Sequence, residues 1–405
     1  MRILIAGATG ALGRHLVPRL TAAGHQVVGT TRHPAKIEMI RRLGAEPAIV
    51  DGLDGAKVRE VVRAAQPEVI VHEMTDLSRA GNLRHFDRAF ATSNLLRTVG
   101  LDHLLAAVRD SGVKRIVAQS FCGWPYAREG AAVKSEDDAL DPHPPRELRR
   151  TLDAIRYLED RVMQAPDLDG VVLRYGGFYG AGTGLFDNQF MDQVAKRRVP
   201  VIGTGAGWWS FIHIEDAANA TALAVERGRP GSIYNIVDDE PAPVCDWLPF
   251  VANLLGAKPP RHLPSWLARI AAGQHLVVMM TDVRAGSNAK AKKDLQWELK
   301  YPSWRAGFCG DRQATGLVHH RGCIKVVEAS ICRVLYGPAV RRNEIAGEVL
   351  RQAAMFTMQG RISLKVPGSK AFDFRGSLLL DRSTLCNLFC TTPVAPRSRG
   401  QRQPS

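Results

Sequence analysis

The sequence predicts an α/β fold, with a doubly wound parallel sheet, a small C-terminal substrate-binding region and a poorly ordered tail. Three observations support this prediction. Short apolar runs alternate with amphipathic segments through the first 120 residues, as they do in repeated βαβ units. A glycine-rich turn, Gly7–Gly13, joins the first apolar run to the first amphipathic segment. The regular pattern fades after Phe308, and residues 391–405 are rich in Pro, Arg, Gln and Ser.

The expected elements follow from the apolar runs and from the turn residues that bound them. In chain order, the runs predict strands over residues 2–6, 26–30, 47–50, 69–72 and 115–118. The segments between them predict helices over residues 13–23, 34–43, 56–65 and 95–111. The proline-rich loop 141–145 interrupts this alternation. Beyond it we expect strands over 170–175, 200–202 and 232–236, and helices over 148–163, 216–227, 245–255 and 265–280.

The chain is expected to divide near residue 305. Residues 1–305 would form the nucleotide-binding domain, with a substrate region contributed mainly by residues 176–210 and 240–305. Residues 306–405 would form a basic tail, largely disordered or irregular. The tail carries 15 Lys and Arg against 6 Asp and Glu, so it supplies +9 of the formal net charge of +14. The main domain is nearly balanced, which makes a nucleic-acid partner unlikely for it.

Composition excludes several other classes of protein. No stretch reaches the roughly 18 uncharged apolar residues of a membrane span, so no membrane role is expected. The chain starts with a strand-like run rather than a leader peptide, which favours the cytoplasm. The seven cysteines follow neither disulfide nor metal-ligand spacing, so no metal is expected.

The glycine-rich turn predicts a dinucleotide site of the Rossmann type. Glycines allow a tight turn and a close approach of the backbone to a pyrophosphate, and the next helix offers free N–H groups and a positive dipole end. Because this turn lies between the first strand and the first helix of a βαβ series, the signal is strong. The residues expected to bind the cofactor here are Gly7, Thr9, Gly10, Ala11, Leu12 and Gly13.

The second and third strands predict how the adenosine end is held. An acid about 20 residues past the glycines usually binds the ribose of NAD. Here the position reads Thr-Thr-Arg32, so we expect Arg32 to pair with a 2′-phosphate and NADP to be preferred, with NAD possible. Asp51, with Gly52 and Leu53, is expected to meet the adenine. Asp54 is equally well interpreted as a helix N-cap.

The fourth strand ends in His72, which lies near the expected cofactor site. A buried histidine with hydrogen-bonded nitrogens is the favoured interpretation of this residue, although its position keeps it among the cofactor-binding candidates.

These motifs together resemble an extended or atypical short-chain dehydrogenase/reductase, of the NAD-dependent epimerase/dehydratase superfamily. The resemblance covers about residues 1–305 and is specific for fold and nucleotide binding, but not for substrate. It implies a small-molecule substrate and is compatible with a homodimer. Besides Asp51 and His72, it rests on Gly7–Gly13, Gly112–Val117, Leu173–Gly180, Phe211–Asp216, Tyr234–Ile236 and Ser287–Trp297. By this resemblance, Tyr175 lies in the segment under the nicotinamide.

The expected catalytic residues depart from the family pattern. The family uses a Ser or Thr after the fifth strand and a Tyr-x-x-x-Lys, in which the tyrosine is the general acid/base. Ser120 fits the serine role, but Thr151 and Ile155 stand at the tyrosine and lysine places, and no Tyr-x-x-x-Lys occurs anywhere in the chain. Another phenol could serve instead: Tyr126, six residues after Ser120, or Tyr175 or Tyr179.

Two functions from different classes follow from these residues. One is an NAD(P)-dependent oxidoreductase or epimerase-like enzyme that acts on a small carbonyl or sugar-like substrate. Its hydride transfer would either use another phenol or need little acid catalysis. The other is a catalytically silent protein that binds NADP(H) as a sensor or interaction partner.

Overall fold

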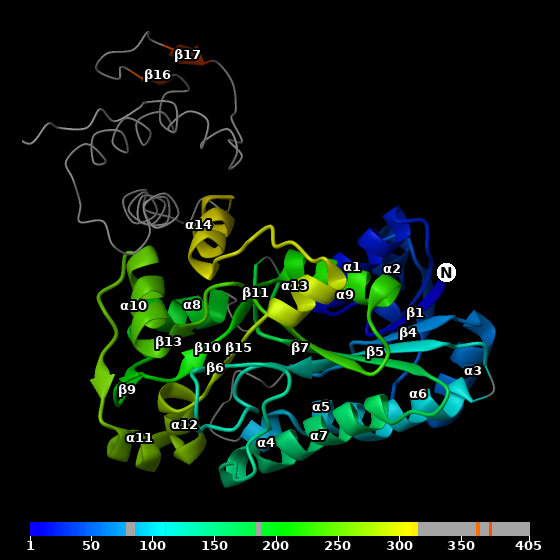
Figure 1. Cartoon of the computed structure of the whole chain (residues 1–405), viewed down its shortest axis with the longest axis horizontal. Helices are drawn as coiled ribbons and strands as arrows, with labels where there is room; N and C mark the ends of the chain where they lie inside the picture. Colours follow the sequence, from blue (N-terminus) through cyan, green and yellow to red (C-terminus); the bar gives the residue numbers. More distant parts are fainter. Residues whose placement is uncertain are drawn as a thin grey trace, which may run out of the picture. The chain divides into compact units, whose positions relative to one another are not determined.

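A seven-stranded parallel sheet forms the centre of the protein (Figure 1). The computed structural model describes residues 1–77, 86–109, 111–180, 182–183, 188–314, 362–364 and 372–374. The strand order is β12-β7-β5-β4-β1-β2-β3, and every neighbouring pair is parallel. Its strands are β1 (Arg2–Ala6), β2 (Gln26–Thr31), β3 (Glu46–Ile49), β4 (Val69–His72), β5 (Arg115–Phe121), β7 (Asp169–Tyr175) and β12 (Ser232–Ile236).

The order of the strands reverses between β1 and β4, which are neighbours although two strands separate them in sequence. The loops after β1 and β4 therefore leave the sheet in opposite directions and open a crevice between them. In open α/β sheets this switch point is where ligands bind. The glycine-rich turn follows β1 and Glu73 follows β4, so the topology brings both segments to this crevice.

Helices cover both faces of the sheet, as the apolar strands require. One face packs against α1, α2, α9 and α13, and the other against α3, α6 and α7 (Figure 1). The flanking elements are α1 (Ala11–Ala22), η1 (Pro34–Lys36), α2 (Ile37–Arg42), α3 (Gly55–Ala65), α4 (Phe86–Ala89), η4 (Arg146–Leu148), α7 (Arg149–Met163), α9 (Ile214–Arg227) and α13 (Ala289–Leu295).

The helix predicted over 95–111 is built from three consecutive parts. They are α5 (Ala91–Leu95), a π-helical turn η3 (Leu96–Gly100) and α6 (Leu101–Val108). The prediction therefore started too late and missed the change of helical type. A π turn holds one residue more than an α turn and shifts the direction of the side chains that follow, and such turns frequently mark functional sites.

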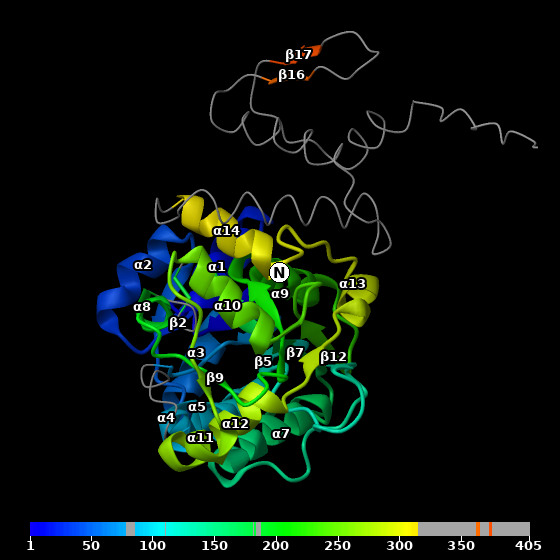
Figure 2. The ribbon, with the colours of Figure 1, turned by 90° about the vertical axis from the view of Figure 1, so that its left-hand side faces the viewer.

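A second apolar core lies beside the sheet and forms a smaller lobe (Figure 2). The helix predicted over 265–280 is broken in two at Gly273. Its φ of 97° is a backbone conformation that residues other than glycine rarely adopt. The lobe contains α8 (Asn188–Ala195), β9 (Val201–Ile202), β10 (Trp208–Trp209), β13 (Ala242–Pro243), α10 (Val244–Leu254), β14 (His262–Leu263), α11 (Ser265–Ala272) and α12 (Gln274–Thr281). Two short parallel pairs join it to the sheet: β8 (Gly177–Tyr179) with β11 (Phe211–His213), and β6 (Val133–Lys134) with β15 (Ala285–Gly286).

The last described helix crosses the boundary predicted at residue 305. This helix, α14, spans Trp304–Ala314. Trp304, Phe308 and Cys309 are buried, and the Phe308 ring packs against Tyr179 with centroids 4.8 Å apart. The folded core therefore extends at least to Cys309, because these side chains complete the second core.

The chain separates into two compact units, Met1–Val326 and Val327–Ser405. In the second unit, β16 (Ile362–Leu364) and β17 (Phe372–Phe374) form an antiparallel pair. Most of the basic tail lies outside the described residues. Among those described, no helix combines the length and apolar character that a membrane crossing requires.

Candidate active site

The glycine-rich turn after β1 has the geometry of a phosphate cradle. Gly7 has a φ of 102°, and a Cβ there would lie 2.7 Å from the carbonyl oxygen of Glu73. A Cβ on Gly13 would lie 2.5 Å from the carbonyl oxygen of Ala8. The N-cap of α1 is Gly10, which offers no side-chain cap, and no acid lies in the first turn. The N–H groups of this helix end are therefore free of internal side-chain acceptors and suit a pyrophosphate.

The other residues predicted in the turn take different positions. Ala11 and Leu12 begin α1, and the Leu12 side chain is buried in the core, so only its backbone faces the turn. The Thr9 hydroxyl lies 3.5 Å from that of Thr31, at the end of β2. The turn is thus in contact with the end of β2, and Arg32 is the next residue after that strand.

Arg32 lies at the end of β2 and is half exposed. Its Nη2 is 3.1 Å from the Asp76 carboxylate, and its Nε donates to the His33 ring at 3.1 Å. Asp76 belongs to the loop after β4, so this ion pair spans the crevice. A 2′-phosphate at this edge would compete with Asp76 for the guanidinium.

The segment after β3 is organised by two aspartates. Asp51 accepts a hydrogen bond from the Leu53 N–H at 3.0 Å, and Asp54 accepts from the Lys57 N–H at 3.0 Å. Asp54 is therefore the N-cap of α3, the alternative that its position predicted. Between them, a Cβ on Gly52 would lie 2.5 Å from the Met74 sulfur, so any larger residue there would require the Met74 side chain to move.

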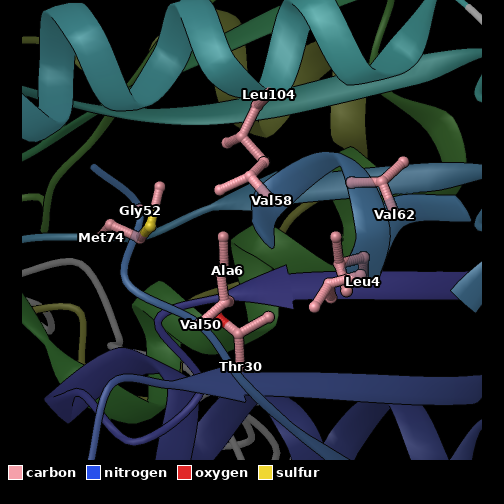
Figure 3. Close-up of a pocket in the computed structure, with 10 residues that line it drawn as sticks. Leu4, Ala6, Thr30, Val50, Gly52, Val58, Val62, Met74 and Leu104 are labelled. Carbon is pink, nitrogen blue, oxygen red and sulfur yellow. The ribbon is translucent and has the colours of Figure 1, made fainter. Parts of the chain in front are cut away.

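A small apolar cavity lies behind this segment, between the sheet and helices α3 and α6 (Figure 3). Its walls carry no charged side chain, so it suits a packing gap rather than a polar ligand. The residues that line it are Leu4, Ala6, Thr30, Val50, Gly52, Val58, Val61, Val62, Met74 and Leu104.

His72 is a buried core residue, as the sequence favoured. Its Nδ1 accepts from the Met74 N–H at 3.3 Å, so its Nε2 donates to the Leu96 carbonyl at 3.2 Å. Burial, together with the nearby Arg97 cation, lowers its pKa to about 4, although the hydrogen bond to the Leu96 carbonyl opposes the fall. The ring is 1% exposed, so His72 supports the crevice from inside and does not present a nitrogen to a ligand.

Glu73 is buried directly after β4. Burial raises its pKa to about 8, although a hydrogen bond from Tyr175 opposes the rise. The Tyr175 hydroxyl lies 3.3 Å from the Glu73 carboxyl and 2.7 Å from the Thr221 hydroxyl. Tyr175 is 1% exposed and its hydroxyl is bonded to these two buried groups, so the structure does not present it as a free phenol.

Ser120 and Tyr126 belong to one buried hydrogen-bond network. Ser120 donates to Glu159 at 2.6 Å, and Glu159 receives two bonds from the Arg174 guanidinium, at 2.8 and 2.6 Å. Arg174 also donates to the Tyr126 oxygen at 3.1 Å, and Tyr126 donates to the Asn235 amide oxygen at 2.7 Å. The network joins β5, α7, β7 and β12.

This geometry opposes the catalytic roles that the sequence assigned to the two hydroxyls. Both protons are already donated inside the network. Burial raises the pKa of Tyr126 above its usual value, which makes it a weaker acid. The third candidate phenol, Tyr179, packs in the second core against Phe308 and the His213 ring. The described structure therefore directs each of these phenols into a core.

The positions of the missing tyrosine and lysine are filled by buried side chains on α7. Ile155 is apolar and 1% exposed. The Thr151 hydroxyl donates to the Asp87 carboxylate at 2.7 Å and accepts from the Asn94 amide at 3.0 Å. Asp87 also accepts from the backbone N–H of Thr151 at 2.9 Å. A hydrogen-bonded cluster of Thr151, Asp87 and Asn94 therefore stands where the family has its acid–base pair.

Two residues of this corner were missed by sequence reasoning, Asn94 and Arg97. Arg97 lies on η3, is 6% exposed, and donates to the Asn94 amide oxygen at 3.4 Å. A cation within the otherwise apolar stretch Leu95–Leu101 was the signal that could have found it.

Comparisons with known proteins agree with this architecture. The NAD-dependent epimerase/dehydratase family matches residues 3–237. A 3-diazoavenalumate denitrifying reductase from a Streptomyces species is 40% identical over 316 residues, which cover 76% of this chain and 99% of the relative. A 4-hydroxy-2-methyl-3-oxo-4-farnesyl-3,4-dihydroquinoline-1-oxide ketoreductase from Stigmatella aurantiaca is 27% identical over 277 residues, 67% of this chain and 79% of the relative.

Solved structures of low sequence identity share the fold. A dTDP-glucose 4,6-dehydratase from Streptomyces venezuelae, with NAD bound, has a TM-score of 0.62 at 19% identity and covers 77% of this chain and 96% of its own. A UDP-glucose 4-epimerase from Thermotoga maritima has a TM-score of 0.61 at 22% identity, with 78% and 99% covered. The crevice, the phosphate cradle and these matches together place the chain in the NAD-dependent epimerase/dehydratase family, as an oxidoreductase- or epimerase-like member whose usual acid–base pair is absent.

Proposed function

We propose that the protein is a reductase that delivers hydride to a small electrophile whose reduction needs no protein acid, such as an aromatic diazonium group. The observation that carries this proposal is the replacement of the family's tyrosine and lysine by Thr151 and Ile155 on α7. Thr151 is bonded to Asp87 and Asn94, and Ile155 offers no cation. A site built in this way has no group of the usual kind to protonate an oxyanion.

The chemistry of the two substrate classes explains the choice. When a carbonyl is reduced, hydride adds to carbon and a proton must reach oxygen, so a general acid accelerates the reaction. When an arenediazonium is reduced, one hydride replaces the diazonium group and N₂ leaves, and no net proton is consumed. A bound nicotinamide dinucleotide supplies the hydride in either case. The relative of 40% identity is named for reductive removal of nitrogen from a diazo compound, which supports the second class.

The test measures products with an arenediazonium probe. Purified protein with NADPH and 4-hydroxybenzenediazonium should release N₂ and form phenol faster than NADPH alone, and deuterium from C4-labelled NADPH should enter the ring. Gly10→Val is the control, because its side chain would occupy the space that the pyrophosphate needs and so remove nucleotide binding. Tight NADPH binding without turnover of the diazonium or of acetophenone would instead favour a silent binding protein. Turnover of acetophenone alone would contradict the substrate class.

We also propose that NADP is preferred over NAD. Arg32 stands where NAD-specific sites carry an acid, and its guanidinium is held at the crevice by Asp76. A charge-assisted bond to the 2′-phosphate should favour NADPH by roughly ten- to a hundredfold, which corresponds to about 1.5–3 kcal/mol. Calorimetric titration of both cofactors measures this preference, and Arg32→Ala should remove most of it. Equal affinities in the unmutated protein would contradict the assignment.

A further inference from the structure

Arg97 is a buried cation for which the described residues provide no counter-ion. Its side chain is 6% exposed, and its Nε has no hydrogen-bond partner among them. The one hydrogen bond of its guanidinium that the structure shows goes to the neutral Asn94 amide, at 3.4 Å. Burial lowers its pKa to about 10, so it stays charged at neutral pH.

The nearby carboxylates are bound to other groups. Asp87 accepts from Thr151 and from the Arg150 N–H at 3.1 Å, which uses both of its oxygens. Asp76 pairs with Arg32, and burial raises the pKa of Glu73 to about 8, so that it carries no charge at neutral pH. Residues 78–85, which lie outside the described part of the chain, include no Asp or Glu in their sequence. Because a buried charge is stable only when paired, the arrangement suits an anion that comes from outside the chain.

The place of Arg97 in the fold connects it to the reaction site. Asn94 donates to Thr151 through its amide nitrogen and accepts from Arg97 through its amide oxygen. Thr151 stands at the tyrosine place of the family, so a single side chain separates the guanidinium from that position. The π turn η3 carries Arg97, and this turn packs against α7. The cation that α7 lacks at Ile155 is therefore present on the adjacent helix.

We propose that Arg97 is the anion-binding group of the active site and that it holds a carboxylate of the substrate. This inference rests on the proposed function, because it takes the substrate of the reductase as the source of the anion. The alternative source is a cofactor phosphate. The substrate is favoured because the glycine-rich turn is at the start of α1 and Arg32 directly follows β2, whereas Arg97 is linked through Asn94 to α7. A guanidinium fork matches a carboxylate in two parallel hydrogen bonds.

The binding experiment compares cinnamate with its neutral analogue cinnamamide in the presence of saturating NADP⁺. The unmutated protein should bind cinnamate more tightly than cinnamamide. Arg97→Met should weaken the binding of cinnamate roughly ten- to a hundredfold and leave the binding of cinnamamide unchanged. Arg97→Lys, which keeps the charge but loses the fork, should retain part of the preference. Arg109→Met, which removes an exposed arginine after the same helical run, is the matched control and should change nothing.

Three further readouts separate this role from other roles. The affinity for NADPH should be the same in all variants. If Arg97→Met weakened NADPH binding as much as cinnamate binding, the guanidinium would belong to the cofactor site and the proposal would be overturned. The melting temperature of Arg97→Met should not fall, since an unpaired buried charge does not stabilise the fold. Cinnamate binding that is unaffected by Arg97→Met, or no tighter than cinnamamide in the unmutated protein, would also overturn it. Diazonium turnover, measured separately, reports on the proposed function alone.

Discussion

At the scale of single residues, burial rather than sequence motif decides what each ionisable group does. His72 is a strand-end histidine at a ligand crevice, yet its two nitrogens bond to backbone groups and its pKa is lowered to about 4. Glu73, the next residue, has its pKa raised to about 8 by the same burial. Both are therefore neutral at pH 7, the histidine without its extra proton and the glutamate with it. The crevice floor carries no charge from either residue.

Glu73 should make stability depend on pH in a defined direction. Its folded pKa lies above the unfolded value of 4.5, so the folded state binds more protons between pH 4.5 and about 8. Stability is therefore lost as pH rises through this window. Glu73→Gln should match the unmutated protein near pH 4.5 and exceed it at pH 8–9, by about 1–3 kcal/mol. Urea unfolding at both pH values measures the difference. The exposed Glu60→Gln is the control, and an equal pH slope for all three proteins would contradict this account.

At the scale of elements, a buried ion pair and the serine bonded to it join the strands β5 and β7 to the helix α7. Arg174 on β7 and Glu159 on α7 share two hydrogen bonds, and both side chains are buried. Ser120 of β5 completes the carboxylate's partners. Serine at this position therefore has a structural reason to be present, independent of catalysis. Helix α7 also carries Thr151, so the position of this helix sets the position of the Thr151 side chain in the candidate site.

Removing one partner of this pair should destabilise the fold strongly. Glu159→Gln would leave the Arg174 cation buried and unpaired, at a cost of about 3–5 kcal/mol. Asp153→Asn on the same helix breaks only an exposed pair with Arg156 and should cost less than about 1 kcal/mol. Urea denaturation of both variants at pH 7 tests the contrast. Similar losses for the two variants would mean that the buried network does not support the sheet.

At the scale of the whole molecule, apolar cores on both faces of the sheet are joined by a further core in the smaller lobe. The first two lie between the sheet and its helices, and the second core of the fold, that of the lobe, lies beside them. Helix α14 seals the second core through Trp304 and Phe308, so the lobe depends on residues that follow the expected end of the domain. The aromatic rings of Phe211 and Trp304 lie 5.5 Å apart and connect β11 to this helix. The smaller lobe therefore depends on α14 for part of its core.

The sequence by itself determined the class of fold, the glycine-rich turn between β1 and α1, and the absence of the usual acid–base pair. These features are local: strand and helix periods repeat every two or 3.6 residues, and glycine positions follow from short turns. The comparisons confirm the family, and the first and last residues of the sheet strands differ by few positions from those expected. The helical run that holds Arg97 was only partly predicted, because a π turn has no simple period in the sequence.

Only the tertiary structure decided which side chains meet. Ser120 and Glu159 are 39 residues apart, and Tyr126 and Asn235 are 109 apart, yet they share one network. Helix α14 also continues past the boundary expected at 305, where Phe308 packs against Tyr179, far earlier in the chain. Alternation along a strand tells which face a residue takes but not its partner across the fold. The free energy of a buried polar group depends on that partner, so its role is settled by packing.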